Sequence, residues 1–321
     1  MSVAVFGAGA FGTALAVALA RDGQAVTLWA HDADHVAAMA EARENAKRLP
    51  GVSLPAMLSV TAEADRAARA DVILMAVPMQ TLAGVLEAHA GLWQGKRILA
   101  CCKGVELATG RFPSQVIGDC AAGAVPALLS GPSFAVDIAA GLPTALTLAA
   151  ADEDEAQALQ EQLSTPVLRL YRSTDMAGVE LGGALKNVIA IACGMAIGAG
   201  LGESARAALI TRGYAEIQRL AVTRGAKPET LAGLSGIGDL VLTCTSEKSR
   251  NYAFGLRLGQ EGHAETIATT EGIATARAVT AVAGREGLEM PITAAIAAVL
   301  DGKWTVHQAA EALMTRPLRS E

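Results

Sequence analysis

The sequence predicts an α/β fold in which a doubly wound sheet domain is followed by an all-helical domain. In the first half of the chain, short apolar runs alternate with helical stretches, a pattern typical of sheets with helices on both faces. After about Ser173 the strand-like runs stop, and long segments rich in alanine, leucine and isoleucine replace them. The 321 residues are enough for two domains, and we expect these to span residues 1–173 and 174–321.

The strands expected in the first domain are mostly continuous apolar runs, which are typical of strands buried on both faces of a parallel sheet. They are expected at Val3–Phe6, Ala25–Ala30, Asp71–Val77, Arg97–Cys102, Val125–Ser130, Thr144–Ala149 and 167–171. Helices are expected after the glycine-rich segment 7–12, over Asp34–Leu49, from about Gln80, and over Asp152–Ser164. The helix at 34–49 should end before Pro50, because proline lacks the N–H that a continuing helix needs.

The second domain should contain helices only, separated by turns that carry glycine or proline. The expected helices are Thr174–Ile197, Ala205–Arg224, Ser249–Leu258, Thr275–Glu286 and Thr293–Leu300. The uncharged run at 188–202 is shorter than the roughly 18–20 residues that a membrane-spanning helix needs. We therefore expect a buried helix there and no membrane span.

Composition excludes several classes of function. The chain carries 26 basic and 32 acidic residues, a net charge of −6, so we expect no nucleic-acid partner and no basic membrane-binding surface. Aromatic residues make up 3% of the chain, which argues against a base-stacking platform. The five cysteines form no CxxC pair, and the histidines show no metal-ligand spacing. Together with an N-terminus that lacks a basic region, this predicts a cytoplasmic protein without a metal site.

The first motif with a chemical meaning is the segment Gly7-Ala8-Gly9-Ala10-Phe11-Gly12, which follows the first expected strand and opens a helix. In a Rossmann fingerprint the first glycine allows the tight turn, the second lets the backbone approach a pyrophosphate, and the third permits close helix–strand packing. The helix N-terminus then offers free N–H groups to the phosphates. The segment predicts dinucleotide binding; an ordinary glycine turn is the alternative.

The end of the second expected strand should distinguish NAD from NADP. An acidic side chain there accepts hydrogen bonds from the ribose of NAD, whereas a cation suits the 2′-phosphate of NADP. The segment ends in His31-Asp32 and so offers both. A solvated loop histidine is the alternative interpretation of His31, and the preference between the two cofactors stays open.

Lys186 is the second candidate, because it is the only charged residue between Glu180 and Glu203. A lysine in such an apolar stretch is costly to desolvate unless it has a partner or a function. A lysine whose ammonium reaches water at a helix edge is the alternative.

A third candidate is the run Ser249-Arg250-Asn251, which follows the segments Leu234–Leu240 and Thr243–Thr245. Serine before arginine and asparagine at a helix start can form an anion site, since a cap, a bidentate guanidinium and backbone donors converge there. A simple helix cap is the alternative.

Taken together, the motifs resemble the bacterial NAD(P)-dependent glycerol-3-phosphate dehydrogenases over essentially the whole chain. The matching segments are GAGAFGTALA at 7–16, CCKGVE at 101–106, SGPSFA at 130–135, GGALKNVIAIACG at 182–194, GIGDLVLTCTS at 236–246, KSRN at 248–251 and Glu271-Gly272. The resemblance implies NADP or NAD as cofactor and the interconversion of sn-glycerol 3-phosphate and dihydroxyacetone phosphate, which supplies glycerophospholipid synthesis. An alanine-rich, weakly charged helical domain also favours a homodimer.

The resemblance further implies roles for individual residues. Lys186 corresponds to the catalytic lysine, Asp239 would orient it and the substrate, and Lys103 would contact substrate and cofactor in the catalytic site. The other implied substrate contacts are Gly131, Ser133, Ser249, Arg250 and Asn251. The implied cofactor contacts are Gly7, Gly9, Ala10, Phe11, Gly12, His31, Lys103, Ala135, Arg250 and Glu271, with Thr269 as a further candidate.

The chain departs from the family pattern at a few positions. Many relatives have serine or threonine in place of Ala10, an aromatic tyrosine or tryptophan in place of Phe11, and a valine near Thr269. Two other functions remain as alternatives: a related dehydrogenase of the ketopantoate or 6-phosphogluconate type, and a dinucleotide-sensing module without catalysis. The first lacks the GDLVLTCTS and KSRN segments, and the presence of Lys186 and Asp239 argues against the second.

Overall fold

The computed structural model describes residues 2–262 and 271–317, and the chain forms two compact units. The first unit comprises the chain up to residue 103 together with 111–180, and the second comprises 104–110 and the chain from 181 onward. The division falls inside helix α8 (Met176–Gly198). The domain boundary expected between residues 173 and 174 stays a prediction.

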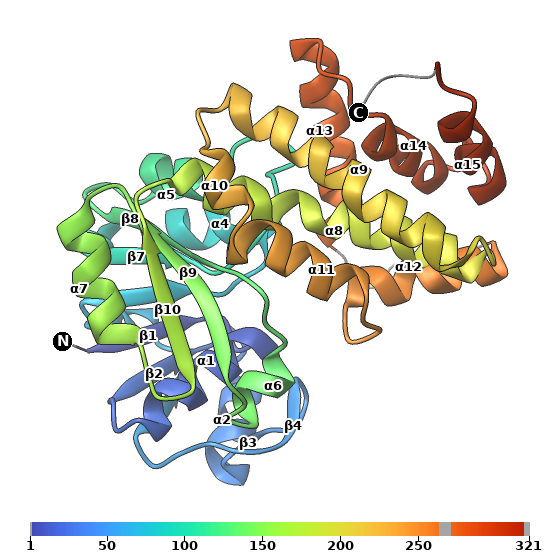
Figure 1. The fold of residues 1–321 in the computed structure, drawn as a ribbon. Coiled ribbons are helices and arrows are strands. Elements are labelled where there is room, and N and C mark those ends of the chain that lie inside the picture. The colour runs from blue at the N-terminus through green and yellow to red at the C-terminus, as the bar shows by residue number, and fades with distance from the viewer. Residues whose placement is uncertain (1, 263–270, 318–321) are drawn as a thin grey trace. The chain divides into compact units, whose positions relative to one another are not determined.

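An eight-stranded sheet forms the centre of the first unit, in the order β10-β9-β8-β7-β6-β1-β2-β5 (Figure 1). Neighbouring strands are parallel except β8 and β9, which are antiparallel. The strands are β1 (Val3–Phe6), β2 (Val26–Trp29), β5 (Leu58–Thr61), β6 (Val72–Met75), β7 (Arg97–Ala100), β8 (Val125–Ser130), β9 (Thr144–Ala150) and β10 (Leu168–Ser173). All were expected except β5, a short edge strand with a polar alternation.

Helices cover both faces of this sheet, as predicted. They are α1 (Ala10–Arg21), α2 (Ala33–Ala42), α3 (Ala64–Ala67), α4 (Met79–Ala88), α5 (Pro113–Cys120), α6 (Ala135–Ala139) and α7 (Glu153–Leu163), with a 3₁₀ turn η1 (Ala90–Leu92). The alternation of side chains along β1 explains the two layers: Val3 and Val5 face the core under α1, whereas Ala4 and Phe6 face the core under α4. Both faces of the strand are buried, hence its continuous apolar sequence.

The predicted helix at 34–49 is wrong beyond residue 42. The chain turns at Arg43, which has a left-handed φ of 49°, and continues as an antiparallel hairpin of β3 (Glu44–Asn45) and β4 (Leu49–Ser53). The Arg43 guanidinium donates hydrogen bonds to the carbonyls of Leu54 (3.0 Å), Leu58 (3.1 Å) and Pro55. These contacts lie 11 to 15 residues away along the chain, so a local helical pattern could not reveal them.

The second unit is all-helical in its described residues, as predicted. Besides most of α8 it contains α9 (Gly202–Thr223), α10 (Pro228–Leu231), the π-helical turn η2 (Leu234–Gly238), α11 (Asp239–Cys244), α12 (Arg250–Glu261), α13 (Glu271–Glu286), α14 (Pro291–Leu300) and α15 (Val306–Met314). In the described residues, α8 is the helix long and apolar enough to cross a membrane, and 89% of its apolar window is buried. It is therefore the core helix of this unit, and the buried helix predicted in the run 188–202 is confirmed.

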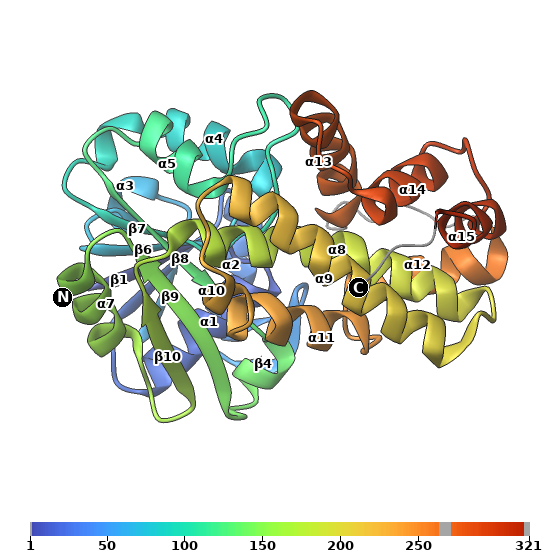
Figure 2. The same ribbon diagram turned by 45° about the horizontal axis from the view of Figure 1, so that its top comes forward.

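Helices α8 and α12 pack with their backbones almost in contact (Figure 2). A Cβ atom on Gly194 or Gly198 of α8 would stand 2.2 or 2.1 Å from a carbonyl oxygen of α12. In return, a Cβ atom on Gly255 or Gly259 of α12 would stand 2.2 or 2.3 Å from a carbonyl oxygen of α8. All four positions therefore require glycine, and the two glycines of α8, which lie in the uncharged run 188–202, have a packing function.

Candidate active site

The glycine-rich turn between β1 and α1 has the geometry of a phosphate-binding loop. Gly7 has a φ of +115°, and a Cβ atom there would stand 2.8 Å from the carbonyl of Ala76. A Cβ atom on Gly12 would stand 2.1 Å from the Gly7 carbonyl oxygen, so the turn needs both glycines. Apart from Gly9 and its two chain neighbours, no atom of the described residues lies within 4 Å of a Cβ placed on Gly9, which leaves space for a ligand at the helix N-terminus.

The first turn of α1 also keeps its N–H groups available. Gly9 is the N-cap residue of α1 and has no side chain to accept from these N–H groups. Backbone N–H groups at a helix start bind phosphate oxygens well, because the helix dipole adds positive potential. The residues present therefore fit a dinucleotide pyrophosphate, and Ala10 and Phe11, half-buried, lie in this same first turn.

At the end of β2, His31 and Asp32 have different environments. Asp32 is the N-cap of α2, and its Oδ1 accepts a hydrogen bond from the His35 backbone N–H (3.1 Å). This bond lowers the pKa of the Asp32 carboxyl. His31 is exposed, so its imidazole remains accessible at the position where the sequence predicts the cofactor ribose.

Three predicted substrate residues of the first unit converge on one carbonyl. The Nζ atom of Lys103 donates a hydrogen bond to the Gly131 carbonyl (3.2 Å), and the Ser133 Oγ donates to the same oxygen (3.3 Å). Gly131 has a φ of +146°, a conformation that favours glycine. Ala135, the predicted cofactor contact, begins α6 directly after this loop. The neighbouring Ser130 hydroxyl, which the sequence did not single out, is buried without a hydrogen-bond partner among the described residues.

In the second unit, Lys186 lies in α8 with 7% of its surface exposed. Its ammonium group forms a buried ion pair with Asp239 and donates a hydrogen bond to Thr243 Oγ1 (2.9 Å). Asp239 is fully buried, and the Thr243 hydroxyl donates to the Asp239 carbonyl oxygen (2.6 Å). The buried ammonium rules out a lysine that reaches water at a helix edge.

The π-helical turn η2 brings Asp239 to Lys186. A Cβ atom on Gly182, one turn before Lys186, would stand 2.7 Å from the Ser235 carbonyl oxygen of η2. A Cβ atom on Gly236 would stand 1.8 Å from the Leu231 carbonyl oxygen. Gly182 thus lets the turn lie directly on α8, Gly236 lets it fold tightly against the end of α10, and α11 begins at Asp239 where the turn ends. π-Helical turns occur frequently at functional sites.

The predicted anion-binding residues lie at the start of α12. Ser249 is the N-cap, with its Oγ accepting from the Tyr252 N–H (3.2 Å), so its capping function holds. Arg250 is exposed, and Asn251 is buried with its Oδ1 accepting from the Gly272 N–H (3.0 Å). This last bond brings Asn251 to the beginning of α13, next to the predicted cofactor residue Glu271.

The predicted site residues thus form two groups, one in each unit. The group in the first unit contains the glycine turn, His31, Lys103, Gly131, Ser133 and Ala135, and the group in the second contains Lys186, Asp239, Ser249, Arg250, Asn251 and Glu271. Thr269 lies outside the described residues. The contact of Thr243 with Lys186 does not follow from the sequence, although Thr243 lies in the segment 243–245; its spacing of one helical turn from Asp239 is the available signal.

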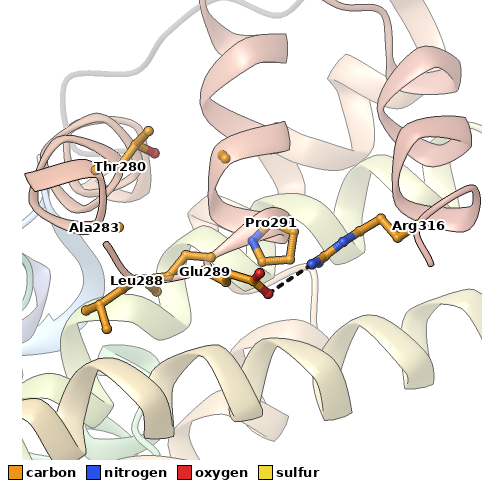
Figure 3. Close-up of a pocket in the computed structure, with 9 residues that line it drawn as sticks. Thr280, Ala283, Leu288, Glu289, Pro291 and Arg316 are labelled. Carbon is orange, nitrogen blue, oxygen red and sulfur yellow. Dashed lines mark hydrogen bonds and ion pairs between the residues drawn. The ribbon is translucent and has the colours of Figure 1, made fainter. Parts of the chain in front are cut away.

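A hollow of about 390 Å³ in the helical unit contains none of these residues (Figure 3). Figure 3 shows an ion pair at its rim between Glu289 and Arg316 (3.3 Å), with Pro291 and Leu288 nearby.

Comparison with known proteins shows the family. The model of the NAD-dependent glycerol-3-phosphate dehydrogenase N-terminus matches residues 2–156, and the model of the C-terminus of the same enzymes matches residues 175–311. The chain belongs to this dehydrogenase family. It is 57% identical to "Glycerol-3-phosphate dehydrogenase [NAD(P)+]" of Ruegeria sp. (strain TM1040), over 100% of both chains. It is 54% identical to the protein of the same name from Paracoccus denitrificans, again over 100% of both chains.

Comparison with solved structures supports the same family assignment. The crystal structure of glycerol-3-phosphate dehydrogenase from Coxiella burnetii covers 98% of this dehydrogenase and 99% of its own chain, with a TM-score of 0.92 and 38% sequence identity. A ketopantoate reductase from Ralstonia eutropha shares the fold alone, with a TM-score of 0.60 and 15% identity. The resemblance and the fold class predicted from the sequence are confirmed.

Proposed function

We propose that this dehydrogenase interconverts sn-glycerol 3-phosphate and dihydroxyacetone phosphate, with Lys186 as the group that transfers the proton. The family membership gives the activity, glycerol-3-phosphate dehydrogenase with NAD(P)+ as cofactor. The observation that carries the role of Lys186 is its burial together with Asp239 and Thr243.

In the direction of ketone reduction, a nicotinamide cofactor held through the glycine turn would supply the hydride that the carbonyl carbon needs. Lys186 then donates a proton from its ammonium group to the carbonyl oxygen, which becomes the new hydroxyl, and in the reverse direction the neutral amine takes this proton back. Asp239 stabilises the ammonium form, because an anion in a buried site compensates the desolvation of the cation. Thr243 fixes the direction of the ammonium N–H bonds, since its hydroxyl hydrogen is already donated to the Asp239 carbonyl.

The remaining site residues would hold the substrate. Arg250 offers an exposed guanidinium that suits a phosphate, and Ser249 and Asn251 flank it at the N-terminus of α12. Lys103 adds a cation beside Gly131 and Ser133 in the first unit. We assign the substrate phosphate to Arg250, Ser249 and Asn251, and a polar contact with the substrate to Lys103, Gly131 and Ser133.

The cofactor would bind through the glycine turn of the first unit. Ala10 in place of a hydroxyl residue removes one hydrogen bond, worth about 0.5–1.5 kcal/mol, while the backbone donors of α1 remain. His31 would contact the adenosine end, and Ala135, Arg250 and Glu271 would contact the rest of the cofactor. Either NADP or NAD fits this arrangement.

The proposal extends to the setting of the enzyme. The family suggests that the product glycerol 3-phosphate is used in glycerophospholipid synthesis and that the enzyme is cytoplasmic. The weakly charged helical unit suggests that two copies of the chain form a homodimer. The buried core position of α8 supports a protein without a membrane span.

An assay with matched substrates tests the function. The purified protein should oxidise NADPH or NADH with dihydroxyacetone phosphate, and turnover with dihydroxyacetone should be at least a hundredfold slower at matched concentration, because phosphate binding energy is used at the reacting carbon. Ketopantoate serves as the control for the related reductases. Equal rates with the phosphorylated and unphosphorylated ketones would contradict the proposal, and so would a preference for ketopantoate.

A further inference from the structure

Asn45 is a fully buried amide directly behind the glycine turn, and nothing in the reaction described so far uses it. Its Nδ2 donates hydrogen bonds to the Ala8 carbonyl (3.0 Å) and to Thr13 Oγ1 (2.8 Å). Its Oδ1 is 2.9 Å from His35 Nε2. Both amide hydrogens and the amide oxygen are therefore engaged, and a fully satisfied buried network of this kind fixes the groups it joins in one arrangement.

The partners determine how this amide is oriented. The Ala8 carbonyl can only accept a hydrogen bond, so the NH₂ group of Asn45 must face it. The amide oxygen then faces His35, whose Nε2 must carry the hydrogen. The three bonds thus support one orientation of the amide only.

Two of these bonds hold the glycine turn and the first turn of α1. Ala8 lies between Gly7 and Gly9, which have no side chains, and Thr13 lies in the first turn of α1. The Gly7 N–H donates to the Trp29 carbonyl (2.9 Å), so the turn is fixed at Gly7 by β2 and at Ala8 by Asn45. Without the second bond the turn would have to be ordered when a ligand binds, and this ordering would weaken affinity.

The hairpin that carries Asn45 is itself firmly held. Arg43 donates to three carbonyls between residues 54 and 58, and the Leu54 N–H donates back to the Arg43 carbonyl (2.7 Å). Glu44 accepts from the Gly51 N–H across the hairpin (2.8 Å). Asn45 therefore approaches the turn from a rigid support.

His35 connects the same amide to the other end of the expected cofactor site. It lies in the first turn of α2, where its N–H donates to the cap residue Asp32, next to His31. We propose that Asn45 is a positioning residue for the dinucleotide: it holds the glycine turn in its binding conformation and connects it, through His35, to the helix that follows β2. This inference rests on the proposed assignment of residues 7–12 to the cofactor pyrophosphate.

The test measures the affinity of ADP-ribose by calorimetry, because this fragment contains the pyrophosphate and ribose but needs neither substrate nor catalysis. We expect Asn45→Ala to weaken ADP-ribose binding at least tenfold and to raise the KM for NAD(P)H similarly. The kcat at saturating cofactor and the KM for dihydroxyacetone phosphate should change less than threefold. Thr13→Val keeps the bond to Ala8 and should weaken binding less than threefold.

The matched control is Leu159→Ala, which removes a buried side chain from α7 at the opposite edge of the sheet. It should lower Tm without changing the affinity for ADP-ribose. If Asn45→Ala does not fold, the variant His35→Leu provides the test. His35 is only half-buried, and its replacement removes the hydrogen bond to the Asn45 amide oxygen. We expect this variant to bind ADP-ribose at least threefold more weakly.

Two results would overturn the inference: an affinity of folded Asn45→Ala within threefold of wild type, or an equal loss in Leu159→Ala. If Asn45→Ala cannot be folded, unchanged affinity in His35→Leu overturns it. Wild-type protein that does not bind ADP-ribose at all would instead contradict the proposed cofactor site. The failure of the inference and the failure of the proposed function are thus separate results.

Discussion

Lys186 and Asp239, 53 residues apart in the sequence, form an ion pair in which both side chains are at least nine-tenths buried. A buried pair of this kind gives little stability relative to apolar residues, but loss of one partner leaves an uncompensated charge. The pair is therefore best explained by a role in catalysis. Substitutions at its two residues can distinguish a loss of activity from a loss of stability.

Replacing Lys186 by methionine keeps the apolar stem and removes the proton donor. We expect kcat to fall at least about a hundredfold, the usual contribution of general acid catalysis. The variant should also lose roughly 3–5 kcal/mol of stability, because Asp239 stays buried without a cation. Adding Asp239→Asn should recover much of the stability and none of the activity. Steady-state kinetics and urea unfolding measure both; more than a tenth of the wild-type kcat in either folded variant would show that the proton comes from another group.

Thr243 should matter for kcat and little for substrate binding. Thr243→Val removes the hydroxyl that accepts from the Lys186 ammonium, a bond worth about 1 kcal/mol, so kcat should fall roughly threefold to tenfold. Thr243→Ser retains the hydroxyl and should keep nearly full activity. A rise in the KM for dihydroxyacetone phosphate with kcat unchanged would contradict a role in orienting the lysine.

Arg250 should be the main determinant of phosphate affinity. Arg250→Ala removes the charge-assisted hydrogen bonds of the guanidinium to the phosphate. We expect kcat/KM to fall by a factor that corresponds to about 2–4 kcal/mol. Arg250→Lys should recover only part of this, because a point charge cannot reproduce the guanidinium fork. The exposed Arg257, on the same helix, provides the control as Arg257→Ala. A kcat/KM of Arg250→Ala within threefold of wild type would refute the assignment.

Glu180 should make stability depend on pH. Burial raises the pKa of this carboxyl to about 7, against the hydrogen bonds that it accepts from the Ser114 N–H (2.7 Å) and Ser114 Oγ (2.9 Å). Because the folded pKa is above the unfolded value of 4.5, the folded state holds the proton more tightly. The resulting stabilisation is complete below pH 4.5 and is lost as pH rises through 7.

Glu180→Gln can keep both contacts with Ser114 and cannot titrate. We expect it to be more stable than wild type at pH 8 by on the order of 1–3 kcal/mol, with a smaller difference at pH 5. Urea unfolding at the two pH values measures this. Wild-type and variant stabilities that change in parallel between pH 5 and 8 would show that Glu180 does not titrate in this range.

The sequence predicted those parts of the fold that depend on local patterns. The apolar run of β1 and the glycines at 7, 9 and 12 need only their neighbours to be interpreted, and most of the long helices followed from composition. The hairpin at β3 and β4 could not be predicted, because Arg43 stops the helix through carbonyls that lie more than ten residues away.

The same distinction applies to the site. Lys186 was noticeable as an isolated charge, and Ser249 as a helix cap, from the sequence alone. The contact of Thr243 with Lys186 depends on η2, which lies against α8 because Gly182 lacks a side chain and folds tightly against α10 because Gly236 lacks one. Asn45 gave no signal either, since its three partners come from α1, α2 and the glycine turn.

The close packing of α8 and α12 also limits how the gene can change in length. An inserted residue rotates the following part of a helix by about 100° and shifts it by about 1.5 Å. Placed between Asn251 and Gly255, one insertion would turn Gly255 and Gly259 away from α8 or turn the helix start away from Gly272. Substitutions can accumulate on the exposed side of α12, at Arg257 or Gln260, but an insertion or a deletion in this segment would be eliminated.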